Sequence, residues 1–326
     1  APRPPTADAG LAAEAPAWER WAPRRTDDGT WGTAHGGRAE HADLAASVQA
    51  RLEEVLVDLA TWLHGQTGDR VLTMAGGTAL NCVANSRVWR ESPFEEVWVQ
   101  PAAGDSGTAL GAALQLAAEA GDTVEPMGSA ALRPARRAAA LAPRPRTAQA
   151  PRPTPDDLPG EVGRILADNG VVAWFDGRAE LGPRALGHRS LLAHPGPVEN
   201  LERLNDVKGR EQFRPVAPMV LLEDAAEIFS GGPVPSPYML FVHEVAPAWR
   251  DRIAAVVHVD GTARIQTVDD STPRLQATIR AFKELTGLPV VVNTSLNTAG
   301  RPMVDAPRAA LELFGSAPVD ALVRGP

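Results

Sequence analysis

Three short segments in the second half of the sequence combine cationic, hydroxyl and amide side chains. A guanidinium group can bind two phosphate oxygens at once, and an ammonium group acts as a movable point charge. The first two segments, 182–190 and 205–215, supply Arg184, His188, Arg189, Ser190, Lys208, Arg210 and Arg214. The third segment supplies Asn293, Ser295 and Asn297. The sequence therefore predicts an anion-binding cleft suited to phosphate, polyphosphate or a nucleotide.

Arginine is abundant in this chain, so each segment alone could be a solvated loop. The sequence holds 32 basic residues, and only Lys208 and Lys283 among them are lysines. Each segment nevertheless adjoins an apolar run typical of a strand, and α/β sheets usually bind ligands at the ends of their strands. One shared cleft is therefore favoured over three unrelated loops.

Two turns in the first half of the sequence could also contact a ligand. Gly76 and Gly77 separate a strand pattern from a helix start near Asn81, and the free amides of a helix start can bind a phosphate. The alternative is a tight strand-to-helix turn. Asp105 lies in a glycine-flanked loop, where it could ligate a metal that also touches nucleotide phosphates, or could cap the following helix.

Composition and missing motifs argue against several other kinds of function. No HExxH, paired CxxC or Walker A pattern occurs, and the single cysteine, Cys82, excludes an internal disulfide and fits a reducing cytoplasm. The net charge of −8 argues against nucleic-acid binding as the main role. No apolar run is long enough to predict a membrane span. The opening APRPPTADAG lacks an initiator Met and a signal-peptide pattern, so we expect the chain to begin inside a longer cytoplasmic protein.

Alternating helical and strand patterns predict an α/β fold that positions these residues. In the first half, a helical pattern over 42–63 precedes strand patterns at 71–74 and 97–99. In the second half we expect strands at 171–175, 218–222, 239–242, 255–259, 263–268 and 289–292, and helices at 156–169, 198–205, 274–285 and 306–313. A Pro/Arg/Ala-rich linker over 131–155 is predicted to separate a domain over 1–130 from a domain over 156–326.

Six motifs occur in one order along the chain and carry a family resemblance. They are AGGTALNCVAN, VQPAAGDSGTALGAAL, ELGPRALGHRS, LNDVKGREQFRPVAP, HVDGTARIQTV and NTSLNTAGRPMV. Together they resemble the family that includes the nodulation-factor, cephamycin and tobramycin O-carbamoyltransferases. The resemblance spans about 42–314 and predicts the carboxy-terminal portion of such an enzyme.

This resemblance implies an incomplete actin-like (ASKHA) domain followed by a YrdC-like α/β domain. The family implies that ATP and carbamoyl phosphate form a carbamoyl adenylate with release of pyrophosphate. A small-molecule hydroxyl, typical of secondary-metabolite and antibiotic biosynthesis, then accepts the carbamoyl group. By position, the resemblance assigns catalysis to Arg184, His188, Lys208 and Arg214, and binding to Gly76, Gly77, Asn81, Arg189, Ser190, Arg210, Asn293, Ser295 and Asn297. It assigns Asp105 to an iron-type metal, and Mg²⁺ is expected to accompany ATP.

One departure from the family pattern leaves alternatives open. Family members carry a His-x-x-x-His metal pair in an early segment, and no two of the seven histidines here have that spacing. The missing N-terminal half could have been removed, could be a separate polypeptide, or could have been lost. The rival hypotheses are a tRNA-modifying enzyme of the threonylcarbamoyl-adenylate type and a catalytically incomplete nucleotide-binding module.

Overall fold

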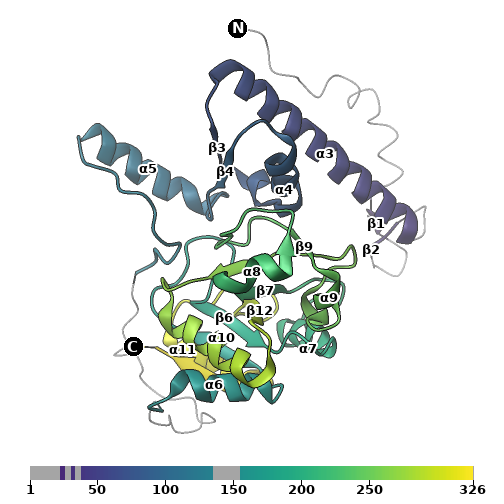
Figure 1. Cartoon of the computed structure of the whole chain (residues 1–326), viewed down its shortest axis with the longest axis vertical. Coiled ribbons are helices and arrows are strands. Elements are labelled where there is room, and N and C mark those ends of the chain that lie inside the picture. Colours follow the sequence, from purple (N-terminus) through teal and green to yellow (C-terminus); the bar gives the residue numbers. More distant parts are fainter. Residues whose placement is uncertain (1–22, 26–30, 34–37, 135–154, 326) are drawn as a thin grey trace. The chain divides into compact units, whose positions relative to one another are not determined.

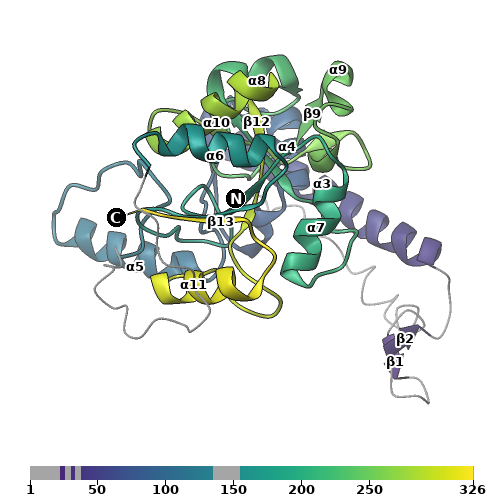
Figure 2. The same ribbon diagram turned by 90° about the horizontal axis from the view of Figure 1, so that it is seen from below.

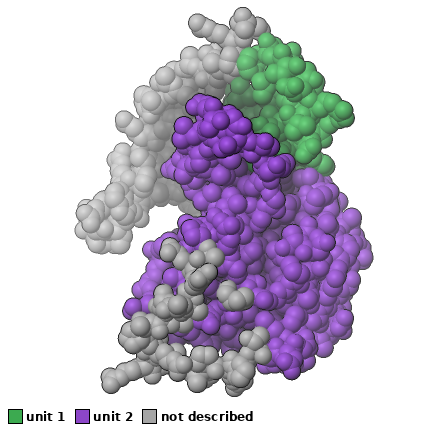
Figure 3. All heavy atoms as spheres, turned by 90° about the vertical axis from the view of Figure 1, so that its left-hand side faces the viewer, with its two compact units in different colours: residues 1–73, 87–98 green, residues 74–86, 99–326 purple. Residues whose placement is uncertain are grey.

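The computed structural model describes residues 23–25, 31–33, 38–134 and 155–325. The chain divides into two compact units (Figure 3). Unit 1 consists of residues 1–73 and 87–98, and unit 2 consists of residues 74–86 and 99–326. Residues 74–86 and 99–130, which precede the predicted linker, thus group with the second half of the chain.

In unit 1 the principal element is α3 (Arg38–Thr67), a helix of 30 residues that contains the predicted helical pattern. Strands β3 (Val71–Met74) and β4 (Glu96–Val99) form a two-stranded sheet and confirm the two predicted strands. A second pair, β1 (Pro23–Arg25) and β2 (Trp31–Thr33), is antiparallel.

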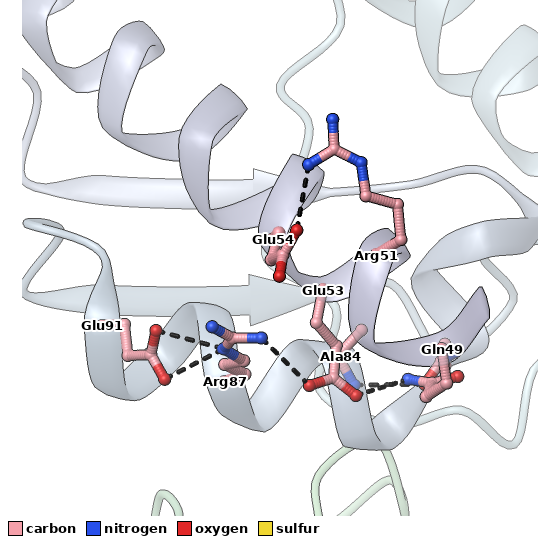
Figure 4. Close-up of polar contacts among 8 residues, drawn as sticks. Gln49, Arg51, Glu53, Glu54, Ala84, Arg87 and Glu91 are labelled. Atoms are coloured by element: carbon pink, nitrogen blue, oxygen red, sulfur yellow. Dashed lines mark hydrogen bonds and ion pairs between the residues drawn. The ribbon is translucent and has the colours of Figure 1, made fainter. Parts of the chain in front are cut away.

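A polar network joins α3 to the end of α4 (Cys82–Glu91) within unit 1 (Figure 4). Arg87 Nε lies 3.0 Å from Glu91 Oε1 on its own helix, and its NH1 lies 3.5 Å from Glu53 Oε2 on α3. Glu53 also accepts a hydrogen bond of 2.7 Å from Gln49. The hydrogen bond with Glu91 raises the pKa of Arg87 above its ordinary value. Charged groups therefore contribute to the contact between these helices.

A six-stranded mixed sheet forms the centre of unit 2, in the order β11-β7-β12-β6-β5-β13. Its strands β6, β7 and β12 are labelled in Figure 1. Its strands are β5 (Val172–Phe175), β6 (Arg189–Ala193), β7 (Ala217–Leu221), β11 (Gln266–Val268), β12 (Val290–Ser295) and β13 (Ala321–Arg324). The two edge strands pair in parallel with their neighbours, and the inner pairs are antiparallel. Strands β5, β6 and β7 are buried along their whole length, as expected for a sheet covered on both faces.

Helices cover both faces of this sheet. The helices α6 (Leu158–Ala167) and α10 (Pro273–Thr286) pack together on one face, and α11 (Pro307–Ser316) contacts β5 and β13 on the other (Figure 2). Further elements of the unit are η2 (Gly77–Leu80), α5 (Ser106–Glu119), α7 (Glu199–Lys208), α8 (Leu222–Ile228), α9 (Pro247–Arg250) and η4 (Ala254–Val256). The mixed α/β fold predicted from the sequence is confirmed.

A small antiparallel sheet, β8 (Phe229–Ser230), β9 (His243–Val245) and β10 (Thr262–Ala263), completes unit 2. Among the helices that the structure describes, none is both long and apolar enough to cross a membrane.

Two predicted strands are wrong, and six observed strands were not predicted. Residues 239–242 form no strand, because Asn85 and Ser86 of α4 bind the backbone of Leu240 and Val242 in place of a neighbouring strand. Residues 255–259 form part of η4 and a turn. Strand β6, which begins inside the polar segment 182–190, was not predicted. The other strands without a prediction are β1, β2, β8, β9 and β13.

The start of the predicted linker is packed rather than extended. Arg178 donates hydrogen bonds of 2.6 and 2.7 Å to the carbonyl oxygens of Leu132 and Arg133, and Leu181 N donates to Ala130 O at 2.8 Å. Ala130 itself is buried. Residues 135–154 of the predicted linker lie outside the described residues.

Candidate anion-binding site

The loop that precedes β6 follows a path that only glycine permits at two points. Gly182 has φ 125°, and a Cβ there would lie 2.7 Å from the carbonyl oxygen of Pro101. Gly187 has φ 95°, and its Cβ would lie 2.5 Å from the side chain of Leu275. Both glycines combine a positive φ with a close approach. They therefore hold the intervening residues, including Arg184, in one tightly packed path.

A buried carboxylate that the sequence analysis did not select shapes the same loop. Glu180 is fully buried, and its Oε1 accepts hydrogen bonds from the backbone amides of Leu186, His188 and Arg189 at 2.5, 3.0 and 3.3 Å. Hydrogen bonds to a buried anion are among the stronger ones in proteins. Glu180 begins the motif ELGPRALGHRS, and that position was its only sequence signal.

Two guanidinium groups in this region have a buried Nε with no hydrogen-bond partner among the described residues. Arg184 donates one long hydrogen bond, of 3.4 Å, to the carbonyl oxygen of Leu80, and its Nε is buried without a partner. The Nε of Arg264 is also buried without a partner. Burial, and then the charge of Arg264, lower the pKa of Arg184 to about 10. Arg264 was missed because it lies between β10 and β11, inside a run predicted as one strand.

Lys208 ends α7 and reaches the end of β12. Its ammonium group donates to the carbonyl oxygen of Ser295 at 2.7 Å, to the hydroxyl of Ser295 at 2.8 Å, and to the side-chain oxygen of Asn297. No carboxylate within the described ranges pairs with it. Burial, and then the charge of Arg210, lower the pKa of Lys208 to about 7. The structure thus brings together Lys208, Ser295 and Asn297.

Arg210 and Arg214 extend this group of cations. Arg210 is half-buried, and its pKa is lowered by burial and then by the charges of Arg214 and Arg264. Arg214 is exposed and forms an ion pair of 2.6 Å with Glu211. The residues Arg184, Lys208, Arg210, Arg214 and Arg264 are called the cation cluster below.

The cation cluster carries more positive charge than nearby groups neutralise. The charge of Arg210 lowers the pKa of Lys208, and the charges of Arg214 and Arg264 lower the pKa of Arg210. The charge of Arg264 also lowers the pKa of Arg184. Like charges in partly buried positions disfavour one another unless an anion offsets them. The arrangement is suited to binding a polyanion, and perturbed titratable groups of this kind are common at functional sites.

Arg189, by contrast, binds the protein's own backbone through both terminal nitrogens of its guanidinium, while its Nε is buried without a partner among the described residues. Its guanidinium donates to the carbonyl oxygens of Asp176, Gly177 and His188 at 2.8–3.1 Å and lies 3.6 Å over the ring of Phe175. The residue has no exposed surface. The structure therefore does not bring Arg189 into the cation cluster as a free donor.

Ser190 and His188 also make local contacts. The Ser190 hydroxyl is buried and accepts a hydrogen bond of 3.2 Å from Gly187 N, and Ser190 pairs with Ser295 between β6 and β12. The half-buried His188 places its Nδ1 3.2 Å from the carbonyl oxygen of Asp176. Neither contact involves a member of the cation cluster.

Asn293 binds the backbone of the loop that carries Arg184. Its side chain is buried and donates to the carbonyl oxygen of Ala185 at 2.8 Å and to Gln266 Oε1 at 2.9 Å. Gln266 in turn donates to the carbonyl oxygen of Leu186 at 2.9 Å. Two buried amides therefore fix the backbone on the carboxyl side of Arg184.

The turn over 76–81 forms a tight strand-to-helix connection, which was the alternative interpretation of these glycines. Gly76 has φ 101° and donates its amide to the carbonyl oxygen of Ala103 at 2.8 Å, and Gly77 begins η2. Asn81 Oδ1 accepts from the amide of Ala84 at 3.1 Å at the start of α4. The turn nevertheless lies beside the cation cluster, through the contact of Leu80 with Arg184.

Asp105 precedes α5, is exposed, and makes no capping hydrogen bond through its side chain. No group of three or more His, Cys, Asp or Glu residues that could hold a metal occurs among the side chains described by the structure. These residues alone do not fit a protein-held metal site.

Two family models match parts of the chain. The family model described as the carbamoyltransferase C-terminus matches residues 163–326, which include the whole cation cluster, and the carbamoyltransferase N-terminus model matches residues 30–114. A solved structure of P. abyssi Sua5 complexed with L-threonine aligns with 52% of this chain and 46% of that chain. Its identity of 15% and TM-score of 0.36 are too low to support an argument.

The curated relatives are longer than this chain. Nodulation protein NolO of Bradyrhizobium diazoefficiens is 39% identical over 88% of this chain and 54% of its own length. Nodulation protein U of the same organism is 44% identical over 81% of this chain and 46% of its own length. The chain thus spans about half the length of the curated relatives it matches. On the family models and these identities, the chain belongs to the carbamoyltransferase family.

Proposed function

We propose that this chain is the part of an O-carbamoyltransferase that activates carbamoyl phosphate with ATP. The observation that carries the proposal is the cation cluster, whose positive charge is only partly neutralised by the protein. Both ATP and carbamoyl phosphate are multiply charged anions, and either would offset this charge. Family membership supports the choice of carbamoyl phosphate over other phosphates.

The proposed reaction balances with water as a third reactant. Carbamoyl phosphate, ATP and water give carbamoyl adenylate, pyrophosphate and phosphate. Water first cleaves the bond between the carbamoyl group and its phosphate, which gives carbamate and phosphate. An oxygen of the carbamate then bonds to the α-phosphorus of ATP as the bond between the α- and β-phosphates breaks. Negative charge then develops on the departing pyrophosphate, where positioned cations stabilise the transition state more than a nucleophile would.

The contacts of each cation suggest its role in this reaction. Arg184 donates only one long hydrogen bond, of 3.4 Å, among the described residues, so its terminal nitrogens can bind phosphate oxygens with little loss of existing contacts. Arg264 adds a second positive charge close enough to lower the pKa of Arg184. Lys208 is held at the end of β12 by Ser295 and Asn297, which place its charge at one point. Arg214 is exposed and is proposed to contact the ligand from the solvent side.

Transfer of the carbamoyl group to a hydroxyl acceptor is proposed to need residues outside this chain. The relatives are about twice as long as the segment they share with it. We propose that the N-terminal half of the full-length enzyme, in the same or a separate polypeptide, holds the iron-type metal and the small-molecule acceptor. Asp105 would contribute one ligand to that metal, and Mg²⁺ would accompany ATP at the cation cluster.

Pyrophosphate release from ATP by the full chain, measured with and without carbamoyl phosphate, tests the proposal. Lys208→Ala and Arg184→Ala should each lower the rate by roughly 100-fold or more, because each removes a positioned charge from the transition state. Lys283→Ala is the matched control, since Lys283 is the other lysine of the chain and pairs with Asp224 on the helix layer.

The alternatives give different results in the same assay. ATP binding without pyrophosphate release, even after the N-terminal half of a relative is added, would favour a nucleotide-binding module. Release that requires threonine and bicarbonate in place of carbamoyl phosphate would favour a tRNA-modifying enzyme. Equal rates in the Lys208→Ala and Lys283→Ala variants would remove the cation cluster from the reaction.

A further inference from the structure

An exposed aromatic side chain lies beside the cation cluster and has no role so far. Phe213 is 81% exposed, and it occupies the loop between Arg210 and Arg214. Single exposed apolar residues are common on protein surfaces and need no explanation by themselves. The position of Phe213 is informative because its loop is held rigidly and because its neighbours are cations.

One buried side chain holds the loop on both sides of Phe213. Asn205 has no exposed surface, and its Nδ2 donates to the carbonyl oxygens of Gln212 and Arg214 at 3.3 and 3.0 Å. Its Oδ1 accepts from Arg210 Nε at 2.5 Å. The residues immediately before and after Phe213 are thus tied to the same amide. The exposure of Phe213 therefore belongs to a fixed loop conformation.

The same loop places an aromatic face next to groups suited to phosphate. The guanidinium carbon of Arg214 lies 6.0 Å from the centroid of the Phe213 ring. The charge of Arg214 lowers the pKa of Arg210, and the charge of Arg210 lowers the pKa of Lys208. Phosphate oxygens held by these cations leave the remainder of a nucleotide to extend towards neighbouring surface, and a base can stack on any exposed aromatic face.

We propose that Phe213 is a stacking platform for the purine base of ATP. The proposal rests on the proposed function, because it assumes that the cation cluster holds the triphosphate. It adds a subsite that separates a nucleoside triphosphate from a bare polyphosphate of similar charge. Phe213 makes this distinction through its ring face, and Asn205 is the positioning residue that fixes the loop.

Titration calorimetry of the full chain with ATP and, separately, with inorganic tripolyphosphate tests this subsite. Phe213→Ala should weaken ATP binding by about tenfold or more while leaving tripolyphosphate binding within about twofold, because only ATP carries a base to stack. Phe213→Trp should retain the ATP affinity. Leu285→Ala is the control, since Leu285 is a 55% exposed apolar residue on α10.

Each other outcome has a definite meaning. Unchanged ATP affinity in Phe213→Ala, or equal weakening of ATP and tripolyphosphate, would overturn the stacking subsite. Equal affinities of the unaltered chain for the two ligands would do the same. If the unaltered chain binds neither ligand, the proposed function itself fails, and the subsite fails with it. If tripolyphosphate binding depends on Lys208 but ATP affinity is unchanged in Phe213→Ala, the proposed function is supported and the stacking subsite is not.

Discussion

The ammonium group of Lys208 lies 2.8 Å from the hydroxyl oxygen of Ser295, so the last residue of α7 meets the last residue of β12. The two residues are 87 positions apart in the sequence. Their contact joins two of the three polar segments from which an anion-binding cleft was predicted. The contact also places an ammonium group with a strongly lowered pKa where a phosphate is expected to bind.

Anion binding should be accompanied by proton uptake. The pKa of Lys208 is lowered to about 7, mainly by burial, and a bound polyanion would raise it. At about pH 8.5 the free protein therefore lacks a proton that the complex holds. Calorimetric enthalpies of pyrophosphate binding should differ between two buffers of unequal ionisation enthalpy, and affinity should fall as the pH rises above 7.

Lys208→Ala should abolish the buffer dependence, and Lys283→Ala should keep it. Identical enthalpies in the two buffers for the unaltered chain would contradict the role of Lys208. The same pKa has a consequence for the ligand-free protein. Between about pH 7 and 10.5 the unfolded chain binds a proton that the folded chain has released, so stability should rise with pH in this window.

Removing Arg264 should affect stability and binding in opposite directions. Its charge lowers the pKa values of Arg184 and Arg210, so the ligand-free cluster contains repulsion. Arg264→Met should leave the free energy of unfolding unchanged or raise it by up to about 1 kcal/mol, while weakening pyrophosphate binding. Urea denaturation and calorimetry measure the two quantities.

Arg280→Met is the matched control for this prediction. Arg280 lies on α10 and pairs at the surface with Glu223, outside the cation cluster. Its removal should change neither quantity appreciably, because exposed ion pairs contribute little. A large loss of stability in Arg264→Met would show instead that its guanidinium is structural.

Glu180 should matter more for stability than any exposed carboxylate. Its Oε1 accepts three backbone amides, and removing it leaves these buried donors without partners. Glu180→Ala should cost about 3 kcal/mol or more of unfolding free energy, and Glu180→Gln should cost less because an amide oxygen can still accept. If the folded Glu180→Gln variant binds pyrophosphate more weakly, the loop held by Glu180 has moved and has displaced Arg184. Glu312→Gln changes an exposed carboxylate on α11, and it should alter neither the unfolding free energy nor pyrophosphate binding.

Arg189 should behave as a structural residue although it lies in a predicted binding segment. Arg189→Met removes the guanidinium that binds the carbonyl oxygens of Asp176, Gly177 and His188, and it should cost about 3 kcal/mol of unfolding free energy. Pyrophosphate affinity measured on the folded fraction should change little. A variant of normal stability that no longer bound pyrophosphate would instead restore the ligand role expected from the sequence.

The contrast between Arg184 and Arg189 shows what the sequence could and could not predict. Both lie in one polar motif, and residue type alone favours phosphate for each. The fold turns one guanidinium towards other cations and the other towards backbone carbonyl oxygens, and this difference depends on contacts from distant segments. Arg264 was missed for the opposite reason, since a single arginine in an apolar run gives no local signal of a site.

The fold was predictable in segments where the pattern of apolar residues matched the element that forms. The helical pattern before β3 and the apolar runs of β5, β7 and β12 were identified within a few residues. The run over 239–242 has the composition of a strand, but the side chains of Asn85 and Ser86 bind its backbone. A sequence pattern records which residues are buried, but it does not record which partner satisfies their backbone groups.

The contact of α4 with residues 239–242 limits how members of this family can exchange parts. Asn85 and Ser86 precede the proline-rich segment, whereas the backbone groups they bind follow it. A chimera joined within 135–154 would combine the start of α4 from one parent with the facing backbone from another. Such a hybrid retains this contact only if both parents carry compatible residues at these positions, so natural recombination at this apparent boundary should be selected against unless α4 is transferred as well.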